Sequence, residues 1–546
     1  MRRRCWWGWG YEGEGLTDEE RQGIAELLGP RIGLDGHRLD PPAIDELALD
    51  RPRLSAPPSL AEMVSDSHEE RVQHAQGKAF RDVVRALHGR IDHPPDLVAR
   101  PRRESDVAAV LDWCAEAGAA VVPYGGGSSV VGGVEPDVGE GYRGAVTLDV
   151  GALDRVLEVD SVSGAARVQA GVLGPALEDQ LRPQGCTLRH FPQSFEVSSL
   201  GGWIATRAGG HFATGPTHID DLVESLRAVT PAGVVETRRL PASGAGPSPD
   251  RLFLGSEGVL GVVTEAWVRI RPRPRFRAGG PVRFPSFAQG AAAVRALAQS
   301  GLGPSNCRLL DPLEALVNGA GDGNSALLVV GFESADHSLG PWAARATELV
   351  ADHGGTVDDG GFKVGELSDG RDRGSGGAAD SWRASFLRGP YLRDALVRLG
   401  ALCETFETAC TWDRFPELHR TVLDATAAGL AEAGAASGFV TCRFTHAYPD
   451  GVAPYFTVVA PARRGSELEQ WDTVKAAASE AVLGAGGTIT HHHAVGRDHR
   501  RWYDRQRPEL FARALAAAKA TLDPVGICNP GVLIDPGRRP SAAASP

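Results

Sequence analysis

The sequence predicts an α+β protein in which a helical region is followed by two domains. A chain of 546 residues is too long for one hydrophobic core, so two or three domains are expected. Short strand patterns alternate with amphipathic helical patterns over residues 93–275, and a second α/β pattern covers residues 276–535. Residues 1–92 are mainly helical with polar breaks, and residues 536–546 are expected to be a disordered tail.

The first helices are placed by their capping residues. The Thr-Asp-Glu-Glu run at residues 17–20 predicts a helix start, and the prolines of residues 51–58 predict a connector. An amphipathic helix is expected over residues 105–117. It should begin at a Ser105 cap and end at Gly118.

The remaining predicted elements are strands and helices that alternate along the chain. Strands are expected at residues 96–101, 119–122, 144–150, 165–171 and 326–332. Helices are expected at residues 173–181, 287–299, 341–353 and 508–522. The glycine- and aspartate-rich residues 354–377 predict a mobile loop, and the sequence contains no internal repeat.

The composition excludes several functions. Hydrophobic residues make up 42% and charged residues 23%, as in ordinary globular proteins. The net charge of −12 argues against nucleic acid as the main partner, because phosphate backbones need a basic face, but it allows a small anionic substrate. Eight scattered cysteines predict reduced thiols in the cytoplasm, and no apolar run is long enough to cross a membrane.

The N-terminal segment joins three arginines at residues 2–4 to three tryptophans. It lacks the continuous apolar stretch of a secretory signal. Trp6, Trp7 and Trp9 fit either a lipid interface or a latch that packs on its own protein, and the latch is the favoured interpretation.

The most informative motif is the loop Pro-Tyr-Gly-Gly-Gly-Ser-Ser-Val-Val-Gly-Gly at residues 123–133. Consecutive glycines permit positive φ and let the backbone approach a ligand closely. Successive N–H groups in such a turn form an anion-binding nest, to which Ser128 and Ser129 add hydroxyl donors. The spacing matches neither the Gly-x-Gly-x-x-Gly motif nor the P-loop, so this is a phosphate cradle of another kind.

Two further glycine-rich segments follow, at residues 192–210 and 254–265. Each alone is compatible with an ordinary turn, whereas three in this order indicate a nucleotide site. Over residues 94–274 the set resembles the PCMH-type FAD-binding domain of the vanillyl-alcohol-oxidase flavoproteins.

That resemblance implies a PCMH-type FAD-binding domain and an α/β cap, or substrate, domain whose C-terminal segment returns to the flavin. The first loop would wrap the pyrophosphate, and the other two would line the adenosine and isoalloxazine. No histidine stands in the first loop, so FAD is expected to be bound noncovalently. The implied cofactor-binding residues are Pro123, Tyr124, Gly125, Gly126, Gly127, Ser128, Ser129, Val130, Pro192, Gln193, Ser194, Phe195, Glu196, Val197, Ser198, Thr206, Arg207, Ala208, Gly209, Glu257, Gly258, Val259, Leu260, Gly261, Val262 and Val263.

Three consecutive histidines at residues 491–493 are expected to follow a strand and turn into the cofactor site. Adjacent residues of an extended strand point to opposite faces, so the three cannot all ligate one ion, and no metal is expected. Together with residues 7–11, 200–208 and 404–408, they are similar to the alkyldihydroxyacetonephosphate synthase family over most of residues 5–535.

This second resemblance implies that the acyl chain of acyl-dihydroxyacetone phosphate is exchanged for a fatty alcohol in ether-lipid synthesis, without net redox change. Flavin N5 would be the nucleophile at substrate C1. Tyr455, His491, His492 and His493 are the implied catalytic residues, and Arg393 is the implied substrate-binding arginine. The phenol needs nearby positive charge, which the histidines and Arg393 are expected to supply. The plain alternatives are a strand aromatic for Tyr455 and an ion pair for Arg393.

Departures from the family pattern leave other functions open. Residues 528–533 contain Asn-Pro-Gly in place of a second arginine found in animal members, as in flavin-dependent 2-hydroxyacid dehydrogenases. Residues 445–451 only faintly match the metal motif of those dehydrogenases, because its later histidine is missing. The alternatives are an FAD-dependent oxidase or dehydrogenase of a 2-hydroxy acid or alcohol, and a flavin-containing lipid-binding or scaffold protein without catalysis.

The partner implied by these patterns is a small lipid or phosphate substrate and not nucleic acid. A cytoplasmic location with peripheral membrane contact fits such a substrate. A homodimer is left open.

Overall fold

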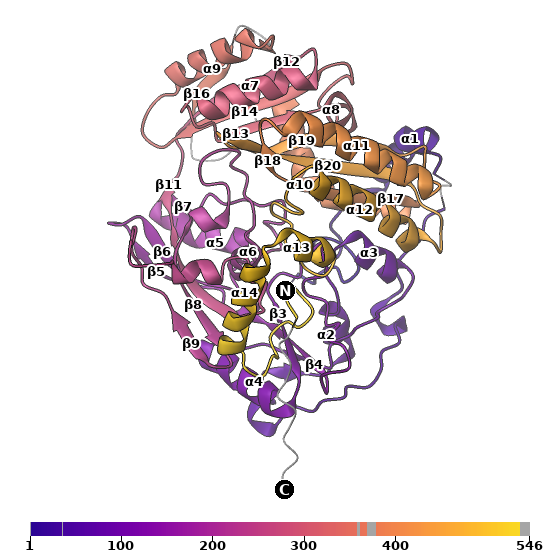
Figure 1. Cartoon of the computed structure of the whole chain (residues 1–546), viewed down its shortest axis with the longest axis vertical. Helices are drawn as coiled ribbons and strands as arrows, with labels where there is room; N and C mark the ends of the chain where they lie inside the picture. The colour runs from indigo at the N-terminus through magenta and orange to yellow at the C-terminus, as the bar shows by residue number, and fades with distance from the viewer. Residues whose placement is uncertain (1, 35–36, 358–360, 368–377, 536–546) are drawn as a thin grey trace.

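The computed structural model describes the chain except for residues 1, 35–36, 358–360, 368–377 and 536–546. The predicted tail therefore lies outside the described residues. Figure 1 shows a lower lobe built mainly from the first half of the chain and an upper lobe built mainly from the second half, with the first helix lying against the upper lobe. The C-terminal helices α13 (Arg500–Gln506) and α14 (Glu509–Leu522) return to the lower lobe.

The N-terminal region is helical, and its first helix starts at the predicted cap. Thr17 Oγ1 accepts the N–H of Glu20 at 3.2 Å, and Glu20 Oε2 accepts the N–H of Thr17 at 2.8 Å. The elements are α1 (Asp18–Ile32), η1 (Ile44–Glu46), η2 (Pro58–Leu60), β1 (Val64–Ser65), α2 (His68–Gln73) and α3 (Phe80–Leu87). Strand β1 pairs with β2 (Leu97–Ala99), so the first sheet extends back across the expected domain boundary at residue 92.

The first sheet has the order β1-β2-β4-β3 and carries the first glycine loop at the end of β3 (Ala120–Tyr124). Strands β2, β4 (Ala145–Asp149) and β3 run parallel. The chain's last segment completes this sheet: the N–H of Val121 donates to Ile527 O, and the N–H of Asn529 donates to Val121 O, both at 2.8 Å.

Helix α4 (Glu104–Ala117) covers the first sheet with a row of buried aliphatic side chains. Gly118 ends the helix in the left-handed conformation, as predicted. The predicted cap is wrong, because the N-cap is Arg103 and Ser105 lies inside the helix. The carboxylate of Asp106 accepts the N–H of Arg102 at 3.0 Å, so the acidic residue of the first turn fixes the start.

The second sheet is antiparallel, with the order β5-β6-β10-β8-β9. Its strands are β5 (Val156–Asp160), β6 (Ala165–Gln169), β10 (Val262–Arg269), β8 (Val223–Thr230) and β9 (Gly233–Glu236). The core of this unit includes Trp203 of α6 (Leu200–Thr206) and Leu177 of α5 (Gly174–Leu181). A small sheet of β7 (Cys186–Thr187) and β11 (Arg271–Pro272) leads to the upper lobe.

The upper lobe is built on a nine-stranded sheet with several helices packed on one face (Figure 1). Its strands are β12 (Phe276–Phe284), β13 (Asn306–Leu310), β14 (Ala326–Ser334), β15 (Thr356–Val357), β16 (Lys363–Glu366), β17 (Ala401–Glu407), β18 (Cys410–Thr411), β19 (Phe439–Ala447) and β20 (Gly451–Pro461). Its helices are α7 (Phe287–Gln299), α8 (Pro312–Val317), α9 (Gly340–Asp352), α10 (Ala378–Arg398), α11 (Phe415–Glu432) and α12 (Glu467–Gly484).

Alternation along β19 separates the helix core of this lobe from a cavity. Cys442 and Phe444 are buried in the hydrophobic clusters, whereas Thr441, Arg443 and Thr445 line the cavity. Because successive strand residues point to opposite faces, the polar residues face the lower lobe.

Two sequence expectations fail in this half of the chain. The expected mobile loop at residues 354–377 contains β15 and β16, which both pair with β12, while residues 358–360 and 368–377 lie outside the described part. The triple histidine does not follow a strand, because residues 486–496 form bends and turns instead.

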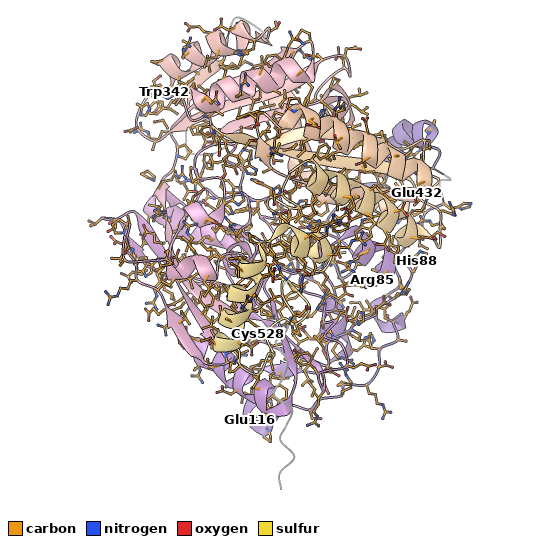
Figure 2. The ribbon with its side chains drawn as sticks, in the orientation of Figure 1. Arg85, His88, Glu116, Trp342, Glu432 and Cys528 are labelled. Carbon is orange, nitrogen blue, oxygen red and sulfur yellow. The ribbon has the colours of Figure 1, made fainter. Side chains whose placement is uncertain are left out.

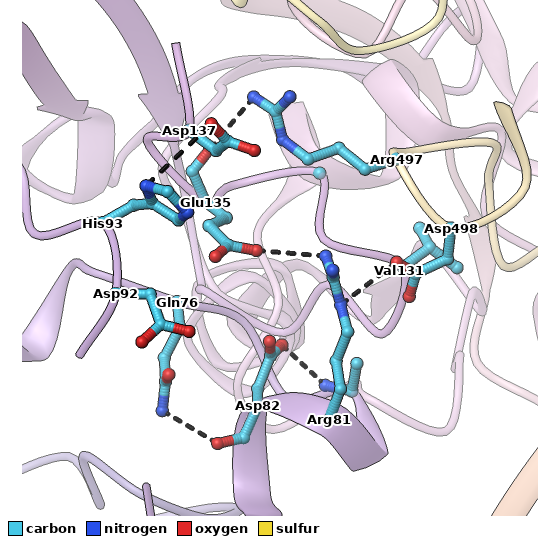
Figure 3. Close-up of polar contacts among 12 residues, drawn as sticks. Gln76, Arg81, Asp82, Asp92, His93, Val131, Glu135, Asp137, Arg497 and Asp498 are labelled. Atoms are coloured by element: carbon cyan, nitrogen blue, oxygen red, sulfur yellow. Dashed lines mark hydrogen bonds and ion pairs between the residues drawn. The ribbon is translucent and has the colours of Figure 1, made fainter. Parts of the chain in front are cut away.

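A buried ion network joins the N-terminal region, the glycine loop and the C-terminal segment (Figure 3). Arg81 lies 3.0 Å from Glu135 and 3.1 Å from Asp498, while Arg85 lies 2.7 Å from both Asp82 and Glu135. Three distant segments therefore share one charged cluster. Among the described residues, we find no helix whose length and apolar character would let it cross a bilayer.

Candidate active site

A cavity of about 340 Å³ lies between the glycine-rich loops of the lower lobe and the sheet of the upper lobe. All three predicted loops reach it. The predicted cofactor residues that line it are Pro123, Tyr124, Gly125, Gly126, Gly127, Ser128, Ser129, Val130, Pro192, Gln193, Ser194, Ser198, Thr206, Ala208, Gly209, Glu257, Gly258, Gly261, Val262 and Val263.

Six predicted cofactor residues do not line the cavity. They are buried in the protein core, exposed to solvent or paired with other residues. Phe195 packs against the core of the second sheet, where Val259 and Leu260 are buried. Glu196 is exposed, Val197 is buried with its carbonyl bound by Arg4, and Arg207 pairs with Asp220 at 2.7 Å. These residues shape the loops, and their neighbours face the cavity.

The first and second loops touch each other closely. A Cβ on Gly126 would collide with the carbonyl oxygen of Val197, so only glycine fits there. Gly127 has φ of 66°, which forms the turn expected of an anion nest.

The third loop is joined to the C-terminal half by Glu257. Its carboxylate accepts the N–H groups of Val495 at 2.9 Å and Gly496 at 2.7 Å. Burial raises the pKa of Glu257 to about 7, and the two backbone N–H bonds oppose that rise. Asn529 Nδ2 donates to Glu257 O and to Gly133 O, at 2.7 and 3.1 Å.

The residues present fit an FAD. The close-packed glycine turn leaves backbone rather than side chains at the end of β3. Asn529 lines the cavity, and its Oδ1 is buried with no partner among the described residues, so it can accept a hydrogen bond from a bound ligand.

Glu407 holds the triple-histidine turn from the other side. Its carboxylate accepts backbone N–H groups of His491, His492 and His493 at 2.5 to 3.1 Å, and the Thr490 hydroxyl at 2.7 Å. Burial raises the pKa of Glu407, but the hydrogen bonds that its carboxylate accepts, including that of the Thr490 hydroxyl, outweigh burial and hold the pKa well below its usual range. The turn is therefore shaped by one ionised, buried side chain.

The histidines form a hydrogen-bonded chain with their surroundings. His491 Nε2 lies 2.8 Å from the Tyr448 hydroxyl and 3.1 Å from His218 Nε2, and His491 Nδ1 lies 3.2 Å from His492 Nδ1. Burial lowers the pKa of His492 to about 3 and also lowers the pKa values of His491 and His493. These imidazoles are neutral near pH 7.

The turn also brings possible metal ligands together. The ligand nitrogens of His446, His491 and His492 lie within 4.8 Å of one another, which an extended strand would not have allowed. However, both ring nitrogens of His446 already face partners, Thr445 Oγ1 at 3.2 Å and Gly210 O at 3.0 Å. The absence of a metal stays a prediction.

Tyr455 is buried at the cavity wall under an arginine. The guanidinium of Arg443 stands 3.8 Å from the centre of its ring, and Arg443 Nη1 pairs with Glu314 at 2.5 Å. Burial raises the pKa of Tyr455, and Arg443 is the main group that opposes the rise. The expectation that the histidines and Arg393 supply this positive charge is wrong, since the histidines are neutral and Arg443 is the cation.

Arg393 lines the same cavity but is engaged by its neighbours. Its guanidinium binds Asp394 Oδ1 at 2.6 and 3.0 Å and donates to Lys78 O at 2.5 Å. The ion-pair alternative therefore holds for Arg393, which also faces the predicted substrate space.

The comparisons with known proteins match this architecture. A family model described as "FAD binding domain" matches residues 95–238, and one described as "FAD linked oxidases, C-terminal domain" matches residues 273–533. The alkyldihydroxyacetonephosphate synthase of Trypanosoma brucei brucei is 32% identical over 508 residues, which cover 91% of this chain and 82% of the relative. The chain belongs to the alkyldihydroxyacetonephosphate synthase family.

Other relatives are more distant. The glycolate oxidase subunit GlcD of Bacillus subtilis is 27% identical, over 80% of this chain and 88% of the relative. A solved alkyldihydroxyacetonephosphate synthase superposes with a TM-score of 0.78 at 24% identity, covering 96% of this chain and 98% of that one. A p-cresol methylhydroxylase superposes with a TM-score of 0.63 at 15% identity, over 95% and 98%. Both structures support the fold alone, and the predicted PCMH-type α+β fold is confirmed.

The FAD-binding domain of this alkyldihydroxyacetonephosphate synthase family member confirms the cofactor prediction, while the noncovalent attachment of FAD stays a prediction.

Sequence reasoning missed Arg443 and Arg308, both of which line the cavity. Burial and the nearby Arg443 lower the pKa of Arg308 to about 9, which leaves it charged at neutral pH. The alternation Thr441, Arg443, Thr445 along one strand was the available signal.

Replacing Glu407 with Gln is expected to disorder the histidine turn. In the unsubstituted protein the backbone N–H groups of the turn donate to a carboxylate. A glutamine amide would place an NH₂ group against some of these donors, so the free energy of unfolding should fall by about 2–4 kcal/mol. Urea unfolding measures the loss. The matched control is Glu432→Gln, at an exposed carboxylate of the upper lobe (Figure 2), which should change stability by less than about 0.5 kcal/mol. Equal stability of both variants would contradict the role of Glu407.

His190 gives a test of pH dependence. It is buried, and burial lowers its pKa to about 3. The unfolded chain binds a proton near pH 6.5 and the folded chain does not, so stability is lost as pH falls below 6.5. Between pH 6.5 and 5 this single group accounts for about 2 kcal/mol. His190→Phe should therefore show a smaller stability loss than the unchanged protein between pH 7 and 5 in urea titrations, and identical losses would contradict it.

Proposed function

We propose that this protein is an FAD-dependent alkylglycerone-phosphate synthase that makes the ether bond of ether lipids. Family membership supports the reaction class. The observation that carries the proposal is one cavity in which the predicted cofactor loops face Tyr455, Arg443 and the histidine turn. In this proposal these residues would act as a proton-transferring group, cations and neutral bases around one space.

The reaction exchanges two oxygen substituents at C1 of acyl-dihydroxyacetone phosphate. The bond from C1 to the acyl oxygen breaks and releases a fatty acid, and a bond from C1 to the alcohol oxygen forms. The alcohol proton leaves with the products, and no electrons are gained or lost overall. Bound FAD supplies the nucleophilic flavin nitrogen for this exchange.

The residues of this chain would bind the substrate and move its protons. A neutral imidazole has one ring nitrogen without a proton, so His492 and His493 can each accept the alcohol proton. Tyr455 would take and return a proton near C1, and the Arg443 guanidinium would stabilise its phenolate. Arg308 and Arg393 provide positive charge for the phosphate.

Apolar residues of the upper lobe provide a place for the chain. The cavity includes Leu392 and Leu396 from α10, Phe439 from β19, and Val458 and Val459 from β20. Burying a methylene here is worth about 0.8 kcal/mol. A lipid substrate also fits a cytoplasmic protein with peripheral membrane contact, and a homodimer remains part of the proposal.

The second candidate is an FAD-dependent oxidase or dehydrogenase of a 2-hydroxy acid or alcohol. It is favoured by the Asn-Pro-Gly segment at residues 529–531 and by the more distant likeness to a glycolate oxidase subunit. Anaerobic mixing separates the two candidates. Bleaching of the flavin by a 2-hydroxy acid supports the oxidoreductase, whereas transfer of a labelled fatty alcohol into an ether product without net flavin reduction supports the synthase.

Tyr455→Phe is expected to retain FAD and lose turnover. The ring still packs under Arg443, but the hydroxyl that carries the proton is gone, so the exchange rate should fall by about 100-fold or more. Flavin content per chain and label exchange measure the two effects. Undiminished exchange would remove Tyr455 from the mechanism.

Arg393→Lys is expected to weaken phosphate-bearing substrates most. A lysine cannot reproduce the planar guanidinium that bridges Asp394 and the cavity, so KM for the phosphate substrate should rise about tenfold. The KM for the alcohol serves as the internal control. An equal rise for both would mean that Arg393 does not select the phosphate.

A further inference from the structure

The N-terminal segment forms a hairpin, which we call the strap and define as residues 3–14. Arg4 and Tyr11 form an antiparallel bridge. The N–H of Cys5 donates to Gly10 O at 3.1 Å, and the N–H of Glu12 donates to Arg3 O at 2.9 Å. Trp6 and Trp9 are 5% and 7% exposed, so both indoles pack on the protein, as the latch interpretation predicted.

The strap is bound to both cofactor loops through Arg4. Its guanidinium donates to the carbonyl of Gly126 in the first loop and to that of Val197 in the second loop, the latter at 3.2 Å. Lys78 also holds the hairpin, because its buried ammonium donates to Cys5 O at 3.0 Å and Trp6 O at 2.9 Å.

The other side of the strap fits against helix α10. Gly10 has φ of 77°, and a Cβ there would lie within 2.8 Å of the Tyr391 ring. The N–H of Trp9 donates to Asp394 Oδ2 at 2.6 Å. The other oxygen of that carboxylate binds the Arg393 guanidinium, so a single carboxylate holds both the strap and the predicted substrate arginine.

Trp9 also lines the active cavity. It shares the cavity with Leu392 and Leu396 of the same helix to which the strap is bound. An indole is a large, flat and rigid apolar surface. The backbone that carries it is fixed by the hydrogen bond from Trp9 N–H to Asp394 and by the packing of Gly10 against Tyr391.

We propose that the strap is part of the active site and that Trp9 is the wall that selects for the apolar chain of the substrate. The inference rests on the proposed function, because it assigns the chain half of that substrate to a named surface. Arg4 and Asp394 act as positioning residues, since they hold the strap between the cofactor loops and α10.

The test uses the full-length, FAD-loaded protein and three variants: Trp9→Ala, Trp9→Phe and Trp342→Ala. Trp342 is a partly buried indole on α9, in the upper lobe far from the cofactor loops (Figure 2), and it serves as the matched control. Calorimetry measures the binding of decanol and of butanol, which requires no turnover. Label exchange then measures kcat/KM for the same two alcohols, and flavin absorbance measures FAD content.

Trp9→Ala should lower the decanol-to-butanol affinity ratio about tenfold, because the longer chain loses its wall and the shorter one loses little. Trp9→Phe should lower the ratio less, and Trp342→Ala should leave it unchanged, with FAD content equal in all. An unchanged ratio in Trp9→Ala overturns the inference. Absence of label exchange in the unsubstituted protein would instead overturn the proposed function. The decanol-to-butanol affinity ratio from calorimetry would still test whether Trp9 binds the alkyl chain.

Discussion

The cavity depends on two buried carboxylates that collect backbone N–H groups from one short turn. Glu407, at the end of β17 in the upper lobe, accepts N–H groups from residues 491–493. Glu257, in the third loop of the lower lobe, accepts those of residues 495 and 496. The turn that carries the histidines is therefore held from both domains at once. Removing either carboxylate leaves several buried donors without a partner, which costs more than the bonds themselves contribute.

The electrostatics of the cavity follow from the same burial. Imidazoles that are held away from water stay neutral, so they serve as proton acceptors and contribute no fixed charge. The fixed positive charge comes from the guanidinium groups of Arg308 and Arg443, which are both buried at the cavity. Because the arginines carry the charge and the histidines do not, the cavity can attract a phosphate and still offer uncharged bases. This distribution of charge also explains why Tyr455 depends on Arg443 rather than on the histidines beside it.

Local signals predicted the parts of the structure that local chemistry determines. Glycine runs located the loops, the Thr17 cap located α1, and helix α7 begins and ends at the predicted residues 287–299. The failures concern long-range contacts. The turn at residues 491–493 exists because a carboxylate from residue 407 binds it, and Arg443 reaches Tyr455 because β19 and β20 pair in the register that places them opposite each other. Neither partner can be identified from one sequence without its fold.

The return of residues 527–529 to Val121 has a consequence for biosynthesis. The edge of the first sheet, next to the first glycine loop, stays unpaired until residues 527–529, about 400 residues further along the chain, have been synthesised. Domains usually fold as they emerge, but here the dinucleotide site closes only after translation of the upper lobe. A product that lacked residues 527–529 would expose an open strand that favours aggregation.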